Sequence, residues 1–264
     1  MNDEILKEAG VSLIDPTEGR SVFKYLSVSS GAKSILDQTI RYSRPQDLND
    51  PFECLPRYDR AEVVSLVEEQ TNDPKQRDKC VESIMNRDFV DFFKRMNDFG
   101  VTSFSTSSTT ILMWSHYAEQ HKGLCIEYDS SKIGSLAKVQ YASTPERILC
   151  SVKNVSKQAV VSAMMTKGGE WAYEKEVRRF EVISNCVKNY DPALKRFVFT
   201  KKLPSDAIRG IYFGLYFDPV LMDDLCKYEY EINPKCCFYQ EKRDTQKFAV
   251  GFDEYKIGSY AWTR

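Results

Sequence analysis

The stretch that most constrains this 264-residue chain is residues 103–129, which read SFSTSSTTILMWSHYAEQHKGLCIEYD. A hydroxyl-rich segment precedes apolar residues that recur at helical spacing from Ile111 to Tyr117. Beyond Gly123, apolar and polar residues alternate as they do in a strand. The pattern predicts a strand, a serine/threonine cap, a short amphipathic helix with Tyr117 directed inward, a stop at Gly123 and a second strand.

The charges of the chain nearly cancel, with 37 basic and 38 acidic residues and a net charge of −1. No global positive field would therefore attract nucleic acid or an anionic membrane. No apolar run is long enough to span a bilayer, and the opening residues, MNDEILKEAG, lack the features of a secretory leader. We therefore expect a cytoplasmic protein without a membrane partner.

Eight cysteines and two histidines occur in the chain, and no two cysteines form a CxxC pair. A structural zinc site needs cysteine and histidine ligands at close spacings, and a disulfide framework is typical of small secreted chains. We therefore expect reduced, largely buried thiols and no bound metal.

Short segments of alternating and helical periodicity succeed one another along the chain, which predicts an α+β fold. The expected elements are strands at 22–28, 39–43, 137–141, 197–202, 207–216, 236–242 and 247–255, and helices at 31–38 (Ile35 and Leu36 inward), 146–167 and 218–230. A polar arm is expected over residues 1–20. A charged helical insertion over residues 58–98 should break near 71–74. We expect it to pack on the sheet, with a substrate lid as the alternative. We predict one α+β domain over residues 1–264 around a central mixed or antiparallel sheet.

Residues 174–183 predict a further strand that carries acidic and basic side chains. A period of two places Glu174, Glu176 and Arg178 on one face of this strand. Such residues are commonly cross-strand charge partners. A carboxylate on a rigid strand can also stabilise positive charge that develops in an active site. The residues alone leave both interpretations open.

Three motifs together resemble a known family. They are KYLS…ILDQTIRYSRPQDLNDPFEC with the Asn49-Asp50-Pro51-Phe52 turn, the MWSHY helix at 113–117, and K-x3-W-x-YEKEVR, which runs from Lys167 to Arg178. Over roughly residues 21–217 the chain resembles the domain-of-unknown-function 2971 family of bacterial and phage-associated proteins. That family name carries no biochemical function.

The order of elements is also similar, more weakly, to the ADP-ribosyltransferase fold, which implies a split sheet. The resemblance matches Phe23-Lys24-Tyr25 to the first strand, Phe104-Ser105-Thr106 to the hydroxyl strand and Tyr117 to the inward helix tyrosine. Glu176, or with less weight Glu174, matches the glutamate of a late strand. The first-strand position usually holds histidine or arginine, whereas this chain has Lys24. A lysine can still hydrogen-bond a ribose or neutralise a phosphate.

The resemblance implies that NAD is a substrate and that no metal takes part. Cleavage of the nicotinamide–ribose bond develops positive charge on the ribose carbon, which Glu176 would stabilise while it orients the 2′-hydroxyl. The other expected contacts are stacking rings (Tyr25 and Tyr117), hydroxyls for the ribose or carboxamide (Ser105 or Thr106), a second carboxylate (Glu174) and cations for the pyrophosphate (Lys24, Arg41 or Arg44).

Two functions of different classes follow from these patterns. One is an ADP-ribosyltransferase that modifies a macromolecular acceptor, either protein or nucleic acid, as a bacterial toxin or phage-defence effector with a neutralising partner protein. The alternative is a non-catalytic nucleotide- or protein-binding module on the same fold. A Ser-His-carboxylate hydrolase that uses Ser115 or Ser105 with His116 or His121 is a third arrangement, but the chain lacks a GxSxG elbow. The orientation of Glu176, into a shared cleft or away from it, should separate the first two.

Overall fold

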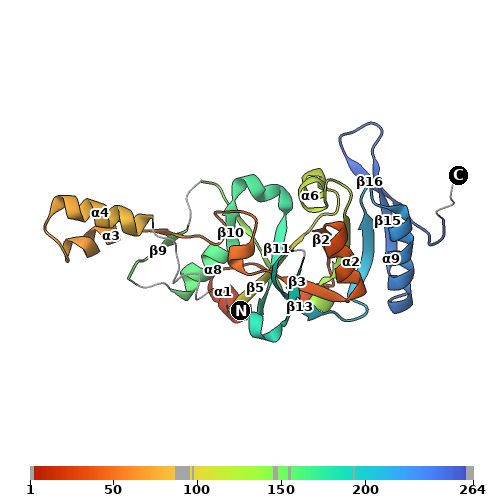
Figure 1. Cartoon of the computed structure of the whole chain (residues 1–264), viewed down its shortest axis with the longest axis horizontal. Helices are drawn as coiled ribbons and strands as arrows, with labels where there is room; N and C mark the ends of the chain where they lie inside the picture. Colours follow the sequence, from red (N-terminus) through yellow and green to blue (C-terminus); the bar gives the residue numbers. More distant parts are fainter. Residues whose placement is uncertain are drawn as a thin grey trace.

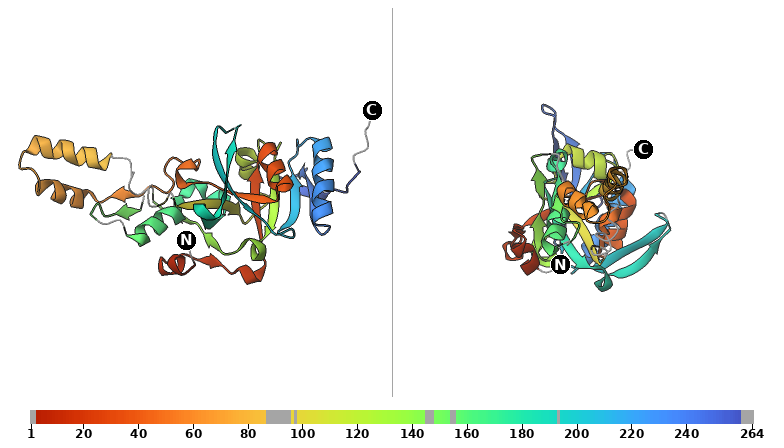
Figure 2. Two further views of the ribbon diagram at one scale, coloured as in Figure 1. Left: turned by 60° about the horizontal axis from the view of Figure 1, so that its bottom comes forward. Right: turned by 90° about the vertical axis from the view of Figure 1, so that its left-hand side faces the viewer.

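The computed structural model describes residues 3–86, 96, 98–144, 148–153, 156–192 and 194–259. Strands and helices both contribute to the body, which confirms the α+β class (Figure 1). The molecule is elongated, with one pair of helices projecting from one end and the C-terminal helix at the other (Figures 1 and 2). Within the described residues, no helix has the length and apolar character needed to cross a membrane.

A large mixed sheet forms the centre of the molecule. Its strand order within the described residues is β1 (Leu13–Ile14), β7 (Leu136–Lys138), β11 (Glu176–Val182), β5 (Phe99–Ser105), β2 (Ser21–Leu26), β6 (Leu124–Asp129), β14 (Ile208–Phe213), β15 (Cys237–Arg243) and β16 (Val250–Glu254). Neighbours run antiparallel except for β14 and β15, which are parallel. The predicted mixed sheet is therefore confirmed.

Smaller sheets flank the main one. They are β12 (Val187–Asp191), β13 (Arg196–Lys202) and β3 (Thr39–Tyr42) in one sheet, β10 (Thr166–Gly168) with β8 (Gln140–Ala142) in another, and β4 (Arg57–Tyr58) with β9 (Leu149–Cys150) in a third. The sequence did not predict β12, β4 or β9. The expected helix at 146–167 is confined to α8 (Lys157–Met165), because β9 and β10 occupy its ends.

The helices follow the apolar periodicity of the chain. They are α1 (Asp3–Glu8), α2 (Val28–Leu36), α6 (Ile111–Tyr117), α7 (Ser130–Ile133), α8 and α9 (Pro219–Ile232), with 3₁₀ turns η1 (Pro16–Glu18), η2 (Pro45–Asp47), η3 (Gly169–Glu174) and η4 (Ile183–Asn185). Ser27 caps α2 by accepting from the backbone N–H of Ser30, and Asp218 caps α9 in the same manner. Ile35 is fully buried, but Leu36 is 46% exposed, so the inward orientation predicted for Leu36 is wrong.

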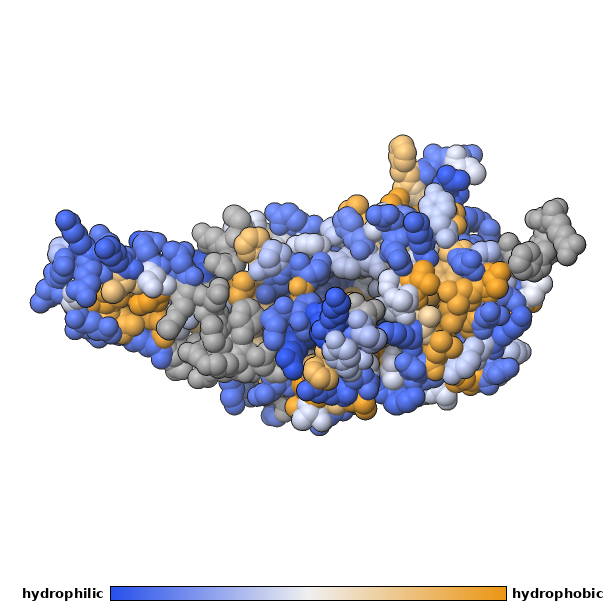
Figure 3. All heavy atoms as spheres, in the orientation of Figure 1, coloured by the Kyte–Doolittle hydropathy of each residue, from blue (hydrophilic) through white to orange (hydrophobic). Residues whose placement is uncertain are grey.

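The insertion forms a separate helical pair, α3 (Arg60–Glu68) and α4 (Pro74–Met85), which projects away from the sheet (Figure 1). The predicted break is confirmed, since Asp73 caps α4. The prediction that the insertion packs on the sheet, however, is wrong, because Val63, Val67 and Val81 are buried in a cluster of their own. Hydrophilic side chains cover most of the pair around an apolar strip (Figure 3). Residues 87–95 and 97 of the insertion lie outside the described residues.

Two local predictions need correction. The arm at 1–20 is not separate from the fold, because Leu13–Ile14 pairs with β7 and extends the main sheet. The helix after the serine/threonine segment ends at Tyr117 and is followed by three left-handed residues, Glu119, Gln120 and His121, rather than stopping at Gly123. Gly123 is needed for another reason: a Cβ there would lie 2.2 Å from the carbonyl oxygen of Leu26.

Candidate functional site

Three neighbouring strands bring distant segments of the chain to one place. In the antiparallel pairing Glu176 on β11 lies opposite Ser105 on β5, and Ser105 lies opposite Phe23 on β2. A small cavity of about 120 Å³ opens beside them, with α6 and the loop after η2 as further walls. Its lining includes Lys24, Tyr25, Ser103, Ser105, Tyr117, Lys167, Glu174 and Glu176.

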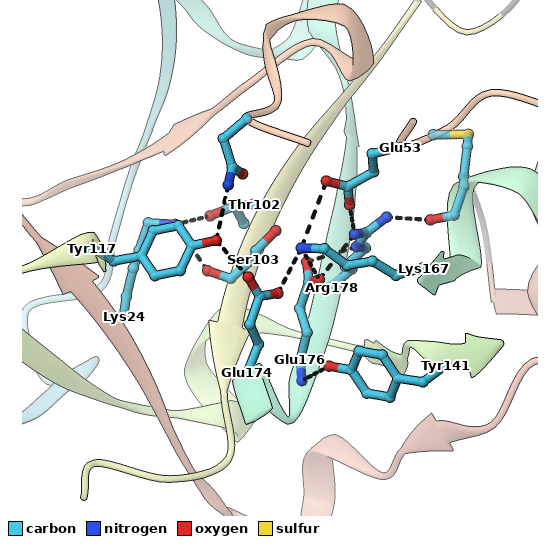
Figure 4. A network of polar contacts seen from close by, with 12 residues as sticks. Lys24, Glu53, Thr102, Ser103, Tyr117, Tyr141, Lys167, Glu174, Glu176 and Arg178 are labelled. Carbon is cyan, nitrogen blue, oxygen red and sulfur yellow. Dashed lines mark hydrogen bonds and ion pairs between the residues drawn. The ribbon is translucent and has the colours of Figure 1, made fainter. Parts of the chain in front are cut away.

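Two buried carboxylates and a buried lysine form the floor of this cavity (Figure 4). Glu174 and Glu176 are 4% and 5% exposed, and Lys167 is 5% exposed. The Lys167 ammonium donates to Glu174 Oε2 at 2.6 Å and to Glu176 Oε2 at 3.3 Å. Glu174 precedes β11, at the end of η3, rather than lying in the strand as predicted. The left-handed Lys175 (φ 47°) turns the chain between the two glutamates.

Arg178 holds Glu176 from the other side. Its Nε and Nη2 donate to the two oxygens of Glu176 at 2.7 and 2.9 Å, and its Nη1 donates to the carbonyl oxygen of Met164 at 2.5 Å. Arg178 also forms an ion pair with Glu53, and its side chain is completely buried. Glu53 in turn lies 3.7 Å from the Lys167 ammonium. Glu176 therefore both lines the cavity and is fixed by Arg178.

Tyr117 connects this network to the loop after η2. The Tyr117 hydroxyl donates to Glu174 Oε1 at 2.5 Å and accepts from the Asn49 side-chain amide at 3.0 Å. Burial, and the hydrogen bond to Glu174, raise the pKa of Tyr117 above its ordinary value. The inward direction predicted for this tyrosine is confirmed, and its hydroxyl is engaged by a carboxylate.

Lys24, on β2, lines the cavity and is half-buried. Its ammonium donates to Thr102 Oγ1 and to the carbonyl oxygen of Ser103, both at 2.9 Å (Figure 4). Burial and, to a smaller extent, the nearby Arg41 guanidinium together lower the pKa of Lys24 to about 8. Both partners of the ammonium are neutral oxygens, so they do not cancel its positive charge.

Burial also perturbs Glu176. It raises the pKa of the Glu176 carboxyl to about 7, against the opposing effects of the Lys167 ammonium and a hydrogen bond from the Ser103 hydroxyl. A carboxyl with a raised pKa in a cavity is a common feature of functional sites, although structural ion-pair networks produce it as well.

Three predicted residues have surroundings different from those expected. Thr106 is exposed and borders a separate cavity of about 500 Å³, so it does not line the site. Ser105 is buried, and its hydroxyl accepts from the Ser107 N–H at 3.1 Å. Tyr25 is 7% exposed, and its ring packs edge-on against Trp114 at 5.3 Å. The Tyr25 ring therefore forms part of the cavity wall and is packed against Trp114.

A larger groove of about 810 Å³ continues from the cavity, and both are lined by Lys24, Asn49, Ser103 and Tyr117. Helix α2 and the sheet β12-β13-β3 form its walls. The groove is lined by the cations Lys24, Lys33, Arg41, Arg196 and Lys202 and the anions Asp37, Asp47 and Asp191.

Ion pairs neutralise some of these charged side chains. Lys33 bonds Asp191 at 2.8 Å, and Arg196 bonds Asp47 at 3.0 Å. The Arg41 Nε is buried without a hydrogen-bond partner among the described residues. Arg44, the alternative phosphate contact, instead stacks over the Phe199 ring at 4.8 Å.

Sequence reasoning assigned Lys167, Glu53, Asn49 and Ser103 no role in the site, and considered Arg178 only as a charge partner on the strand. A signal existed for two of them, because Lys167 and Arg178 begin and end the K-x3-W-x-YEKEVR motif. The Lys167 ammonium lies 4.8 Å over the Trp171 ring, which explains this spacing. Glu53 directly follows the Asn49-Asp50-Pro51-Phe52 turn, in which the Phe52 N–H donates to Asp50 Oδ1.

The fold and the site together define an α+β protein with a buried carboxylate–cation network at a cavity between three strands. Comparison with protein families matches residues 113–179 to the family described as "Protein of unknown function (DUF2971)". This confirms the predicted family resemblance over the segment that carries Tyr117, Lys167, Glu174 and Glu176. Neither the curated proteins nor the solved structures contain a match to the chain.

Proposed function

We propose that this protein is an ADP-ribosyltransferase-like enzyme that binds NAD and transfers ADP-ribose to a macromolecular acceptor, either a protein or a nucleic acid. The observation that carries the proposal is the convergence of Lys24, Tyr117, Glu174 and Glu176, from three distant segments, on one cavity. The weak resemblance in element order to the ADP-ribosyltransferase fold supports it. The roles of toxin or phage-defence effector, with a neutralising partner, belong to the same proposal.

The two connected spaces suit a dinucleotide. Ligand sites for small molecules commonly have volumes of about 300–1,000 Å³, which includes the groove of about 810 Å³. The inner cavity of about 120 Å³ has room for one end of such a ligand. Lys24 lines both spaces and Arg41 lines the groove, so these two cations could pair with diphosphate oxygens.

The charge of the network suits the chemistry. Three carboxylates (Glu53, Glu174 and Glu176) face two cations (Lys167 and Arg178), which leaves one net negative charge when all are ionised. Loss of nicotinamide breaks its bond to ribose and develops positive charge on the ribose carbon. A fixed negative charge in a water-poor cavity stabilises that transition state more than it would in water.

One observation favours the alternative, a non-catalytic nucleotide- or protein-binding module. Both oxygens of Glu176 already accept hydrogen bonds from Arg178. A ribose hydroxyl would have to share or replace one of these bonds. Glu176 would then act as a structural anion that holds Arg178, while the groove binds its ligand without reaction.

Transfer from labelled NAD to cell lysate, measured together with NAD binding by calorimetry, tests the proposal. Glu176→Gln should lower transfer by roughly 100-fold or more, the scale expected when one transition-state contact is lost. Lys24→Met should weaken NAD binding. The matched control is Glu170→Gln, an exposed glutamate of the same segment, which should change neither.

The outcomes separate the two functions. Binding without transfer by the wild type would establish the binding module and refute the enzyme. Equal transfer by wild type and Glu176→Gln would refute the role of that carboxylate. Absence of NAD binding would refute the enzyme and an NAD-binding module, and would leave only a module that binds another nucleotide or a protein.

A further inference from the structure

A second cluster of reactive groups lies on the other side of α6. Ser115 and Tyr117 are two residues apart on the helix, so their side chains point about 200° apart around its axis. The Ser115 hydroxyl lies 3.3 Å from His121 Nε2, and His121 Nδ1 lies 2.8 Å from Glu241 Oε1. Figure 1 shows α6 beside the strands of the C-terminal hairpin, which supply Glu241 from β15.

The arrangement determines which ring nitrogen can accept a proton. Both oxygens of Glu241 lie within 3.0 Å of His121 Nδ1, so this nitrogen carries the hydrogen that the carboxylate accepts. Nε2 of the neutral ring is then free to accept from the Ser115 hydroxyl. The Leu215 N–H donates to Glu241 Oε2 at 2.8 Å and keeps the buried carboxylate in place.

The backbone and a neighbouring ring hold His121 in position. His121 has a left-handed conformation (φ 65°), which is rare for a residue with a side chain. Its ring stacks on Trp114, with centroids 6.2 Å apart and an interplanar angle of 16°. The side chain of His121 is still 19% exposed, whereas that of Glu241 is fully buried. Ser115 is half-exposed, so the serine and the imidazole can be reached from solvent.

We propose that Ser115, His121 and Glu241 form a reactive triad that accepts acyl groups from small esters. A nucleophile bonded to a base that a third group orients is the recurring pattern of such centres, on unrelated folds and in any chain order. Leu112, 45% exposed and one helical turn before Ser115, offers apolar surface for the acyl group. Tyr216, 59% exposed, donates its N–H to the His121 carbonyl oxygen at 2.9 Å and adds to this surface.

The reaction balances with water as the only co-reactant. Ser115 Oγ forms a bond to the ester carbonyl carbon, and the hydroxyl proton moves to His121 Nε2. The bond from that carbon to the alkoxy oxygen breaks, and the alcohol leaves with the proton from His121. Water then attacks the acyl-serine with His121 as base, which releases the acid and restores Ser115.

A fluorophosphonate probe, with the adduct located by peptide mass spectrometry, tests the triad. The full-length protein should carry the adduct on Ser115, and Ser115→Ala should remove it. His121→Gln and Glu241→Gln should slow labelling by roughly 100-fold or more, because an unassisted serine is a weak nucleophile. Ser108→Ala and His116→Ala are matched controls. Ser108 is a half-exposed serine, and His116 instead bonds the Tyr173 hydroxyl at 2.9 Å; both controls should label at the wild-type rate.

Absence of an adduct on wild-type Ser115 under conditions that label a known serine hydrolase would overturn the triad. Equal labelling of Ser115 in the wild type and in His121→Gln would also overturn it. Circular dichroism of each variant separates loss of reactivity from loss of folding. None of these residues lines the NAD cavity, so either proposal can fail without the other.

Discussion

Replacement of Arg178 by methionine should strongly destabilise the fold. Arg178 is fully buried, donates twice to Glu176 and once to the Met164 carbonyl, and pairs with Glu53. Methionine fills similar volume but supplies no charge. Removal of one partner from a buried ion pair commonly costs about 3–5 kcal/mol, because the remaining charge stays buried and uncompensated. For a chain of this size that corresponds to a fall in melting temperature on the order of 10 °C.

Urea unfolding followed by circular dichroism measures this loss. Arg179→Met is the matched control, since Arg179 is the next residue of β11, is partly exposed and lies 3.6 Å from Glu181. Arg179 also donates to the Tyr42 hydroxyl at 2.9 Å, but Lys201 would still pair with Glu181, so its loss should cost about 1–2 kcal/mol. If Arg178→Met costs no more than Arg179→Met, the network does not stabilise the fold in the way argued.

The cause of the loss can be tested separately. Without Arg178, the folded-state pKa of Glu176, which burial already raises to about 7, should rise further above its unfolded value. A carboxyl with a raised folded pKa favours the folded state at low pH, and this contribution disappears as pH rises through the folded pKa. The deficit of Arg178→Met should therefore be smaller at pH 5 than at pH 8. Addition of Glu176→Gln should restore part of the stability at pH 8, and an additive loss would contradict an electrostatic cause.

Two further predictions concern other parts of the chain. Burial raises the pKa of Glu229 to about 7 from an ordinary 4.5, so the free energy of unfolding should fall as pH rises between these values. Glu229→Gln should therefore make the urea unfolding midpoint depend less on pH between pH 5 and 8. If the midpoint of the exposed control Glu231→Gln depends on pH no more strongly than that of Glu229→Gln, the prediction is contradicted. Val67→Ala should destabilise the α3–α4 pair by about 1–3 kcal/mol through lost packing. Hydrogen exchange should then accelerate in α3 and α4 but not in β5, and equal acceleration in both would show that the pair does not open independently.

The local pattern of the chain determined much of the fold. Alternation predicted β2, β13 and β14, and the spacing of apolar residues predicted α2, α6 and α9, because the period of burial follows directly from backbone geometry. The same reasoning placed Tyr117 inward and put Glu176 and Arg178 on one face. Short or polar elements such as β12 carry too weak a periodicity to be recognised in this way.

Tertiary structure alone decided which of these side chains meet. Sequence spacing placed Lys24 and Glu176 on strands, but only the sheet order places β5 between β2 and β11 and brings both residues to one cavity. Lys167 and Glu53 reach the site from β10 and a loop, and their role depends on long-range packing that local periodicity does not encode. The histidines of residues 103–129 illustrate the same limit. The sequence offered His116 and His121 equally as the base beside a serine, and only the tertiary structure distinguishes them. Strand β15 brings the buried carboxylate of Glu241, 120 residues later, against the ring of His121.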